Sequence, residues 1–227
     1  MPTFRSLPAD CEPCVFELSG REGSGGEGHA PHFAAAFTRF LPDALSLVDR
    51  PAIIFGHSLG ALFAHQLACA LPADQQALVH AVIVSAHRPP RVTAEKATHP
   101  GAPFVVRTHD SLLQDLQRFG GVSAELLADA DFRETAVTLL GHDLHLADTY
   151  AEPAGPAPRI PYHVWYGTDD ATLDARELAG WDEACAAPVV HRGFPGGHFY
   201  PYERGESAAA LGALAAEARA ASGRPVP

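Results

Sequence analysis

Hydrophobic and polar positions along the chain alternate between strand-like and helix-like patterns. Short apolar runs predict strands at 14–18, 52–56, 81–85, 162–166 and 189–191. Helical spacing predicts helices at 32–48, 61–71 and 203–221, with two or three more between about 109 and 150. The run at 81–85 is nearly continuous, as in a parallel strand buried on both faces. Strands that alternate with helices predict an α/β fold, with a mostly parallel sheet covered by helices on both faces.

Loops and linkers divide this pattern into one domain with an insertion. Residues 20–28 are polar and glycine-rich, and residues 153–161 are a proline-rich linker that returns to the sheet. The stretch from about 88 to 155 is too long for a simple crossover between strands. We therefore expect a single domain over residues 1–227, with a lid inserted over the strand ends at about 88–155.

Composition and charge narrow the class of protein. The 227 residues are 47% hydrophobic and 19% charged, as in ordinary globular proteins. A net charge of −11 argues against general affinity for nucleic acids or membrane surfaces. No apolar run approaches the roughly 20 residues that span a bilayer, and the first residues lack the apolar core of a signal peptide. We expect a soluble, cytoplasmic enzyme.

The cysteines and paired histidines do not predict a disulfide framework or a metal site. These residues are Cys11, Cys14, Cys69 and Cys185, and the pairs His29 with His32 and His142 with His145. The C-x-x-C at 11–14 leads into a strand-like run, whereas a redox motif of this kind opens a helix whose dipole stabilises the thiolate. Each histidine pair lacks a matching second cluster. We therefore predict that the protein binds no metal.

Residues 56–60 read Gly-His-Ser-Leu-Gly, between the strand at 52–56 and the helix at 61–71. G-x-S-x-G in this context is the pattern of a nucleophile elbow. The glycines permit a turn tight enough to hold Ser58 in a strained conformation with its hydroxyl exposed. We predict Ser58 as a nucleophile, and we interpret His57 as a lining residue because the elbow points neighbouring side chains away from the serine.

A serine nucleophile needs a base and an orienting acid, which follow it on this fold in the order acid, then histidine. Residues 166–170 and 194–200 both lie at strand-to-loop junctions, so their side chains emerge at the same end of the sheet as Ser58. We predict His198 as the base that accepts the serine proton. Asp170 completes a G-x-x-D turn and is the predicted acid, which fixes the tautomer of the base. Asp169 is the alternative acid.

Further blocks accompany the elbow and the triad in a fixed order. They lie at 18–22 (Leu-Ser-Gly-Arg-Glu), 85–90 (Ser-Ala-His-Arg-Pro-Pro), 116–121 (Leu-Gln-Arg-Phe-Gly-Gly), Tyr150, 178–181 (Leu-Ala-Gly-Trp) and 194–199 (Phe-Pro-Gly-Gly-His-Phe). Together they cover nearly all of residues 4–200 and resemble the type II thioesterases that accompany nonribosomal peptide and polyketide synthases. The Gly-Arg-Glu, lid and Pro-Gly-Gly-His-Phe blocks separate this family from generic lipases and esterases.

The resemblance implies an α/β-hydrolase fold and a serine hydrolase that acts on thioester bonds. Its substrates would be acyl, aminoacyl or peptidyl groups on the phosphopantetheine thiol of carrier proteins, and its role would be to clear misprimed or stalled synthases. It assigns the triad to Ser58, Asp170 and His198, and one oxyanion N–H to Leu59. The enzyme would act as a monomer, with carrier-protein domains as partners and no cofactor beyond the phosphopantetheine that the substrate carries.

The start of the chain departs from the family pattern. Relatives begin with an extra strand and a His-Ala-Gly-Gly-type turn that supplies the second oxyanion N–H, and this chain matches only downstream of that turn. The extra strand lies between the strand at 14–18 and the elbow strand, so we expect strand edges to be re-paired or exposed. Loss of one oxyanion donor predicts turnover lowered by about 10²–10³-fold. The alternatives are a misplaced start, or a donor supplied by residues 23–26.

Two other functions stay open on the residues alone. Esters are hydrolysed by the same acyl-enzyme chemistry, so a small-molecule esterase or acyltransferase of this fold is one alternative. A non-catalytic remnant that binds carrier proteins is the other. Carrier proteins are often acidic, as this chain is, so docking would rely on local basic residues. The candidates are Arg88, Arg91 and Lys96.

Overall fold

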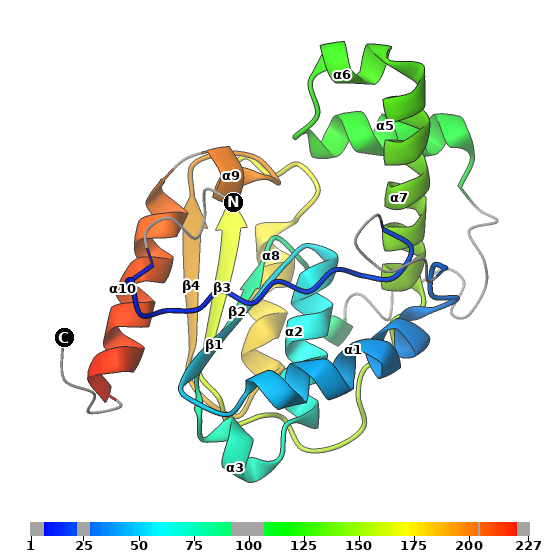
Figure 1. Ribbon diagram of the computed structural model, residues 1–227. Helices are drawn as coiled ribbons and strands as arrows, with labels where there is room; N and C mark the ends of the chain where they lie inside the picture. Colours follow the sequence, from blue (N-terminus) through cyan, green and yellow to red (C-terminus); the bar gives the residue numbers. More distant parts are fainter. Residues whose placement is uncertain (1–6, 22–27, 92–106, 204, 222–227) are drawn as a thin grey trace.

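Four parallel strands form one sheet within the part of the chain that the structure, a computed structural model, describes (Figure 1). The described residues are 7–21, 28–91, 107–203 and 205–221. The strands are β1 (Ala52–His57), β2 (Val79–Ser85), β3 (Tyr162–Gly167) and β4 (Val189–Phe194), in the order β1-β2-β3-β4. All three neighbouring pairs are parallel, which confirms the predicted α/β class.

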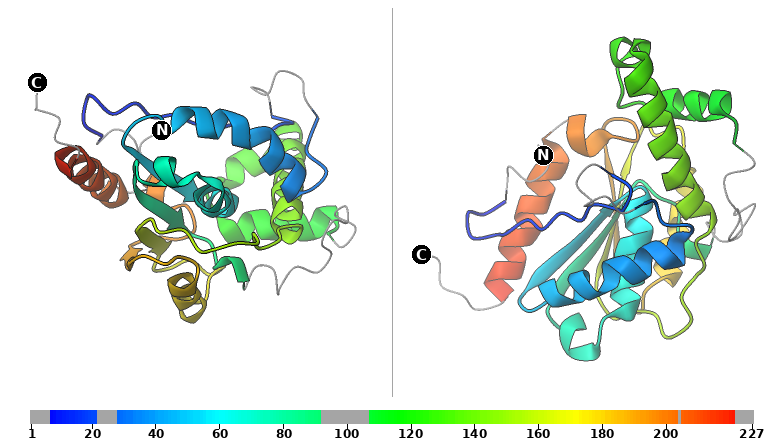
Figure 2. Two further views of the ribbon diagram at one scale, coloured as in Figure 1. Left: turned by 90° about the horizontal axis from the view of Figure 1, so that it is seen from below. Right: turned by 45° about the vertical axis from the view of Figure 1, so that its right-hand side comes forward.

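Helices connect the strands and cover the sheet on both faces. They are α1 (Phe33–Leu47), α2 (Leu59–Ala70), α3 (Ala73–Gln76), α5 (His109–Phe119), α6 (Ala124–Ala128), α7 (Ala130–Asp148), α8 (Ala175–Leu178), the 3-10 helix η2 (Ala179–Glu183), α9 (Tyr200–Glu203) and α10 (Glu206–Ala221). Helices α1 and α2 lie on one face and α10 on the other (Figures 1 and 2). The predicted last helix at 203–221 therefore starts later, after the short helix α9.

The side chains of β2 alternate between two cores, which explains its continuous apolar run. Val82 and Val84 pack with the buried residues of α1 and α2. Ile83, between them, packs with Trp165 of β3 and Leu211 of α10. Because successive side chains of a strand point to opposite faces, both faces of a doubly covered strand must be apolar. The sheet is thus held from both sides through its central strands.

The predicted strand at 14–18 is wrong. Residues 11–18 are extended but belong to no sheet, and within the described residues no backbone hydrogen bond joins 12–18 to another segment. A strand requires a neighbour to complete its ladder, and β1 has a described neighbour only on its β2 side. Phe16 instead packs its ring against Phe40 of α1, with centroids 4.6 Å apart. The apolar run therefore contacts a helix rather than a sheet.

Helices α5 and α6 lie beyond the carboxyl ends of the strands, and α7 runs from them down to contact α1 and α2 (Figure 1). They pack on one another through a small separate core of Leu112, Leu116 and Val137. They belong to the segment at 88–155 that the sequence predicts to be a lid, of which residues 92–106 lie outside the described residues. No helix of the described residues combines the length and apolarity that a bilayer span requires.

Buried neutral histidines predict that the fold loses stability in acid. His65 on α2 is buried, and its Nδ1 lies 2.9 Å from the hydroxyl of Tyr162. Burial lowers the pKa of His65 to about 4, from an ordinary value of 6.5. The unfolded chain therefore binds the extra proton below pH 6.5 and the folded chain resists it. Stability is complete above pH 6.5 and falls towards pH 4, by roughly 3 kcal/mol for this residue alone.

We expect the melting temperature to fall steadily as pH is lowered from 7 to 4, measured by circular dichroism. A His65→Gln variant, whose side chain cannot take up a proton, should show a shallower pH dependence. A melting temperature that is constant over this range, or a variant with unchanged slope, would contradict the prediction.

Candidate active site

The turn between β1 and α2 holds Ser58 in a conformation that non-glycine residues rarely adopt. Its φ of 54° and ψ of −126° lie outside the regular regions. The N–H of Ser58 donates to the carbonyl of Ser85 at 2.8 Å, which fixes the turn to the end of β2. The G-x-S-x-G segment therefore has the strained strand-to-helix geometry of a nucleophile elbow.

The elbow requires glycine at position 56 but not at position 60. A Cβ placed on Gly56 would lie 2.0 Å from the carbonyl oxygen of Gly60, which is backbone and cannot turn aside. A Cβ on Gly60 would meet nothing within 4 Å. Only Gly56 is thus imposed by the close approach of the two ends of the turn.

Gly56→Ala should destabilise the fold by at least about 3 kcal/mol, because the backbone on both sides of Ser58 must separate. This corresponds to a melting temperature lower by about 10 °C in a chain of this size. Gly60→Ala is the matched control within the same motif, and calorimetry should find it within about 2 °C of the unmodified chain. Equal stability of the two variants would exclude this reading of the turn.

Three predicted residues from three loops meet at the carboxyl end of the sheet. The Oγ of Ser58 lies 3.0 Å from Nε2 of His198, and Nδ1 of His198 lies 2.8 Å from Oδ2 of Asp170. His198 and Asp170 are buried, with 5% and 7% of their surfaces exposed. With Nδ1 protonated and donating to the carboxylate, Nε2 is free to accept the serine proton.

Thr172, which the sequence analysis missed, holds the carboxylate of Asp170 in place. Its backbone N–H and its hydroxyl both donate to Oδ1, at 2.9 and 2.6 Å. Burial raises the pKa of Asp170, but the hydrogen bonds from His198 and Thr172 outweigh it and hold the pKa below the ordinary value. Asp170 therefore keeps its negative charge beside the histidine at every pH near neutrality.

Asp169, the alternative acid, does not contact His198. Its Oδ2 accepts a hydrogen bond from the backbone N–H of Gly196 at 3.3 Å, and its own N–H donates to the carbonyl of Gly196 at 3.0 Å. These bonds join the loop after β3 to the loop that carries His198. The two adjacent aspartates thus have different tasks: Asp170 meets the ring, and Asp169 ties the two loops together.

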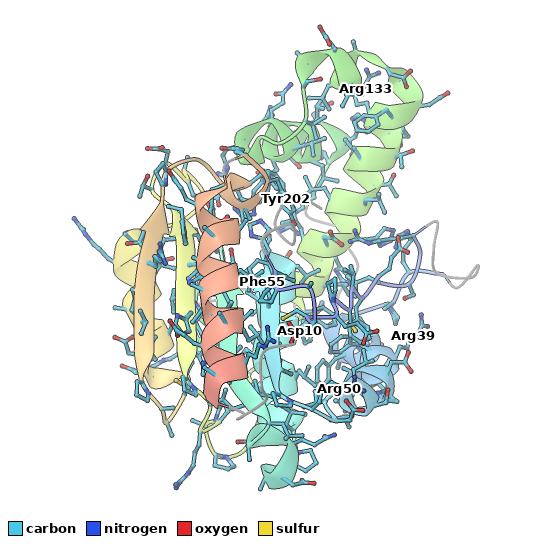
Figure 3. The ribbon with its side chains drawn as sticks, turned by 60° about the vertical axis from the view of Figure 1, so that its left-hand side comes forward. Asp10, Arg39, Arg50, Phe55, Arg133 and Tyr202 are labelled. Carbon is cyan, nitrogen blue, oxygen red and sulfur yellow. The ribbon has the colours of Figure 1, made fainter. Side chains whose placement is uncertain are left out.

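Ser58 and His198 open into a cavity of about 1350 Å³. Its wall includes β1 and parts of the 10–18 segment, α1, α5 and α10, so that Phe55 and Asp10 both line it (Figure 3). Phe119, the last residue of α5, covers the base, with its ring centroid 4.8 Å from that of His198. The site is therefore a cavity with both apolar and charged residues in its wall, beside the serine and the histidine.

The cavity also includes Leu59, the first residue of α2 and the predicted oxyanion donor. The first N–H groups of a helix have no partner within it, and the helix dipole favours negative charge there. The backbone of Leu59 is therefore suited to stabilise an oxyanion formed at Ser58. Residues 23–26, the alternative source of a second donor, lie outside the described residues, and the expected loss of turnover stays a prediction.

The histidines with metal-like spacing have structural contacts. His32 caps α1, its Nδ1 accepting from the N–H of Ala35, and Nε2 of His145 lies 2.8 Å from the carbonyl of Pro31. The rings of His29 and His142 stack with centroids 3.5 Å apart. These contacts join the segment before α1 to α7.

The predicted docking residues have different settings. Arg88 is half-buried, 3.9 Å from Glu177, and donates weakly to the carbonyl of Thr172 at 3.4 Å. Arg91 is exposed, 3.8 Å from Glu183. Lys96 lies outside the described residues. Among these, Arg88 lies beside the loop of the catalytic acid, and Arg91 lies on the surface.

A nucleophile elbow, a Ser–His–Asp series and a parallel sheet that carries them at its carboxyl end form the arrangement that is typical of serine hydrolases with the α/β-hydrolase fold. A family model described as "Thioesterase domain" matches residues 4–216. The chain belongs to this thioesterase family, as its motifs predict.

Two of the relatives are named for biosynthetic pathways. The chain is 28% identical over 199 residues to the "Probable cadicidin biosynthesis thioesterase" of Streptomyces griseus, a match that covers 88% of this chain and 53% of that protein. It is 23% identical over 197 residues to the "Gramicidin S biosynthesis protein GrsT" of Aneurinibacillus migulanus, covering 87% and 75%. The chain thus spans about half the length of the first relative and three quarters of the second.

Solved structures have the same fold. The type II thioesterase BorB from the borrelidin biosynthetic cluster superposes with a TM-score of 0.70 at 26% identity, over 89% of this chain and 79% of that one. The RedJ thioesterase from the prodiginine pathway of Streptomyces coelicolor superposes with a TM-score of 0.72 at 22% identity, over 90% and 77%. The second likeness shows the fold only.

Proposed function

We propose that this chain hydrolyses acyl, aminoacyl or peptidyl thioesters on the phosphopantetheine arm of carrier-protein domains, as an editing enzyme of nonribosomal peptide or polyketide synthesis. The observation that carries the proposal is the bonded series Ser58–His198–Asp170 at the wall of the cavity. Family membership and the BorB likeness favour the thioester over other acyl compounds. The partners would be carrier proteins, and the enzyme would act as a cytoplasmic monomer without a cofactor of its own.

The proposed reaction assigns a step to each of these groups. Ser58 Oγ attacks the thioester carbonyl carbon while Nε2 of His198 takes the hydroxyl proton, and the carbonyl oxygen becomes an oxyanion beside the N–H of Leu59. The tetrahedral intermediate collapses, the C–S bond breaks, and the histidine returns its proton to the departing thiol. Water, deprotonated by the same Nε2, then attacks the acyl-serine ester. The bond between the acyl carbon and Oγ breaks and Nε2 returns the proton to Oγ, which releases the acid and restores Ser58.

The residues that position this chemistry differ from those that perform it. Asp170 faces Nδ1 and keeps the ring in the tautomer that leaves Nε2 as the acceptor. It also stabilises the imidazolium that forms when the proton arrives. Phe119 packs against the ring, with centroids 4.8 Å apart. Thr172 acts one step further out, since it contacts the acid through two hydrogen bonds.

The test compares one acyl group on two leaving groups. Purified chain is offered acyl-phosphopantetheinyl carrier protein and the p-nitrophenyl ester of the same acid, and kcat/KM is measured for both. We expect the carrier thioester to be hydrolysed at least about tenfold more efficiently than the ester. Preference for the ester would favour a small-molecule esterase. Binding of the carrier in a pull-down without hydrolysis of either substrate would favour a non-catalytic carrier-binding protein.

A further inference from the structure

A second buried hydrogen-bonded series lies beside the triad. Nδ1 of His57 lies 3.0 Å from the hydroxyl of Ser85, and that hydroxyl lies 2.6 Å from the hydroxyl of Tyr200. The three residues end β1, end β2 and begin α9. Ser85 and Tyr200 are 0% and 1% exposed. We refer to His57, Ser85 and Tyr200 as the relay.

The relay connects the same two backbone segments as the bond between nucleophile and base. His57 immediately precedes Ser58, and Tyr200 follows His198 by two residues. Ser85 also accepts the backbone N–H of Ser58 through its carbonyl oxygen, at 2.8 Å. Ser85 therefore holds the elbow through two bonds, from its hydroxyl to His57 and from its carbonyl to the N–H of Ser58. The same hydroxyl also bonds Tyr200 in the loop that carries His198.

Both members at strand ends precede a strained residue. Among the described residues, Ser58 and Ala86 are the non-glycine positions with positive φ, at 54° and 52°. Such conformations cost about 1–3 kcal/mol each and persist only where their surroundings determine them. His57 and Ser85 stand directly before these two positions and bond to each other. The relay thus supplies hydrogen bonds directly beside the two positions where the backbone conformation is strained.

Packing alone does not explain the hydroxyl groups of Ser85 and Tyr200. A buried hydroxyl is costly unless it is hydrogen-bonded, and alanine and phenylalanine would fill the places of Ser85 and Tyr200 without that requirement. Each hydroxyl can donate one bond and accept another, so Ser85 uses both when Tyr200 donates to it and it donates to Nδ1 of His57. Within the described residues, the buried Nε2 of His57 has no hydrogen-bond partner. A buried side chain whose polar group would lose its partner on moving is restricted to the arrangement in which the bond is made. The relay is therefore suited to fix a geometry.

The ring of His57 lies 5.2 Å from that of His198, centroid to centroid. Burial, and secondarily the nearby His198, lower the pKa of His57 to about 3. His57 is therefore neutral when His198 becomes an imidazolium, and it places no second positive charge beside the reacting base.

We propose that His57, Ser85 and Tyr200 are positioning residues that set the separation of Ser58 Oγ from His198 Nε2. This inference rests on the proposed function for its reaction but concerns the reactivity of Ser58 towards any acylating or phosphonylating reagent. Displacement of a catalytic group by about 1 Å can lower a rate by about 10²-fold. Breaking the relay should therefore lower turnover with little effect on binding of the substrate.

The test uses Ser85→Ala, Tyr200→Phe and the double variant. Each single variant should lower kcat for a carrier thioester by about 10- to 100-fold, with KM within twofold, and slow fluorophosphonate labelling of Ser58 to a similar extent. Either substitution alone already removes the bonded link between the elbow and the histidine loop. The double variant should therefore have a kcat within about threefold of the slower single variant. Independent contacts would instead multiply the two effects.

Tyr162→Phe is the matched control. Tyr162 is also fully buried and its hydroxyl also bonds a histidine, Nδ1 of His65 at 2.9 Å, but neither residue lines the cavity. This control should lose similar stability and keep its labelling rate. The proposal is overturned if both relay variants keep kcat and labelling within threefold of the unmodified chain, if Tyr162→Phe loses as much, or if Ser58 of the unmodified chain is not labelled. Labelling of Ser58 without hydrolysis of carrier thioesters would contradict the proposed function and leave the relay to be judged by the labelling rates.

Discussion

Ser58→Ala should lower kcat for a carrier thioester by about 10⁴- to 10⁶-fold and abolish covalent labelling by a fluorophosphonate. The hydroxyl is the group that His198 Nε2 faces at 3.0 Å, so its loss removes the acyl-enzyme route and leaves only the general effects of the cavity. Intact-mass spectrometry of the labelled chain and a thiol-release assay measure the two results.

The matched control for this substitution is Ser123→Ala. Ser123 caps α6 through its side chain, well separated in the chain from the elbow, and it does not line the cavity. This variant should lose about 1 kcal/mol of stability and retain labelling and turnover. Turnover by Ser58→Ala above about one hundredth of the unmodified rate would mean that another residue carries the nucleophile. Carrier binding should survive in Ser58→Ala, because the serine is needed for bond cleavage and not for docking.

The nucleophile and its partners could be predicted because each is carried by a local pattern. Gly56 marks a backbone approach that a side chain would obstruct, because a Cβ added there would lie 2.0 Å from the carbonyl oxygen of Gly60. His198 and Asp170 each follow a strand that the apolar runs locate, and parallel strands bring such positions to one end of the sheet. Chain order and sheet topology were therefore sufficient to predict that Ser58, His198 and Asp170 meet.

The extended segment at 14–18 shows where local pattern fails. Its apolar residues predict a strand, but a strand exists only through the ladder it forms with a neighbour. Phe16 packs on Phe40 and Val15 is 62% exposed, and β1 has a described neighbour only on its β2 side. Whether residues 14–18 pair as a strand depends on which segment lies beside them in space. The local sequence pattern does not contain that information.

The supporting residues were missed for the same physical reason. Thr172 lies two positions after Asp170, where a threonine in a loop gives no signal of its own. Ser85 and Tyr200 meet across 115 positions of the chain. His57 lines the cavity, as predicted, but its bond to Ser85 was not predicted. Their contacts arise from the order of strands in the sheet. Local motifs identify the groups that react, and only tertiary structure identifies the groups that hold them.

Asp170→Asn should lower kcat by about 10⁴-fold while leaving the fold intact. An asparagine amide at this place can present its NH₂ to Nδ1, which favours the tautomer with the proton on Nε2. That tautomer cannot accept the proton of Ser58, and the neutral amide no longer stabilises the imidazolium. The effect should be present at every pH near neutrality, because the hydrogen bonds that outweigh burial keep the pKa of Asp170 low and the native carboxylate charged throughout.

Asp169→Asn is the control that makes this test specific. Its side chain accepts from the N–H of Gly196, a bond that an amide oxygen can also accept, so kcat should stay within about threefold of the unmodified chain. Steady-state kinetics on a carrier thioester and melting curves of both variants separate loss of catalysis from loss of structure. An equal loss of kcat in the two variants would mean that the loop, rather than the carboxylate facing His198, is what the substitution disturbs. A large loss in Asp169→Asn alone would reassign the acid, because the adjacent aspartates would then have exchanged the tasks that their contacts give them.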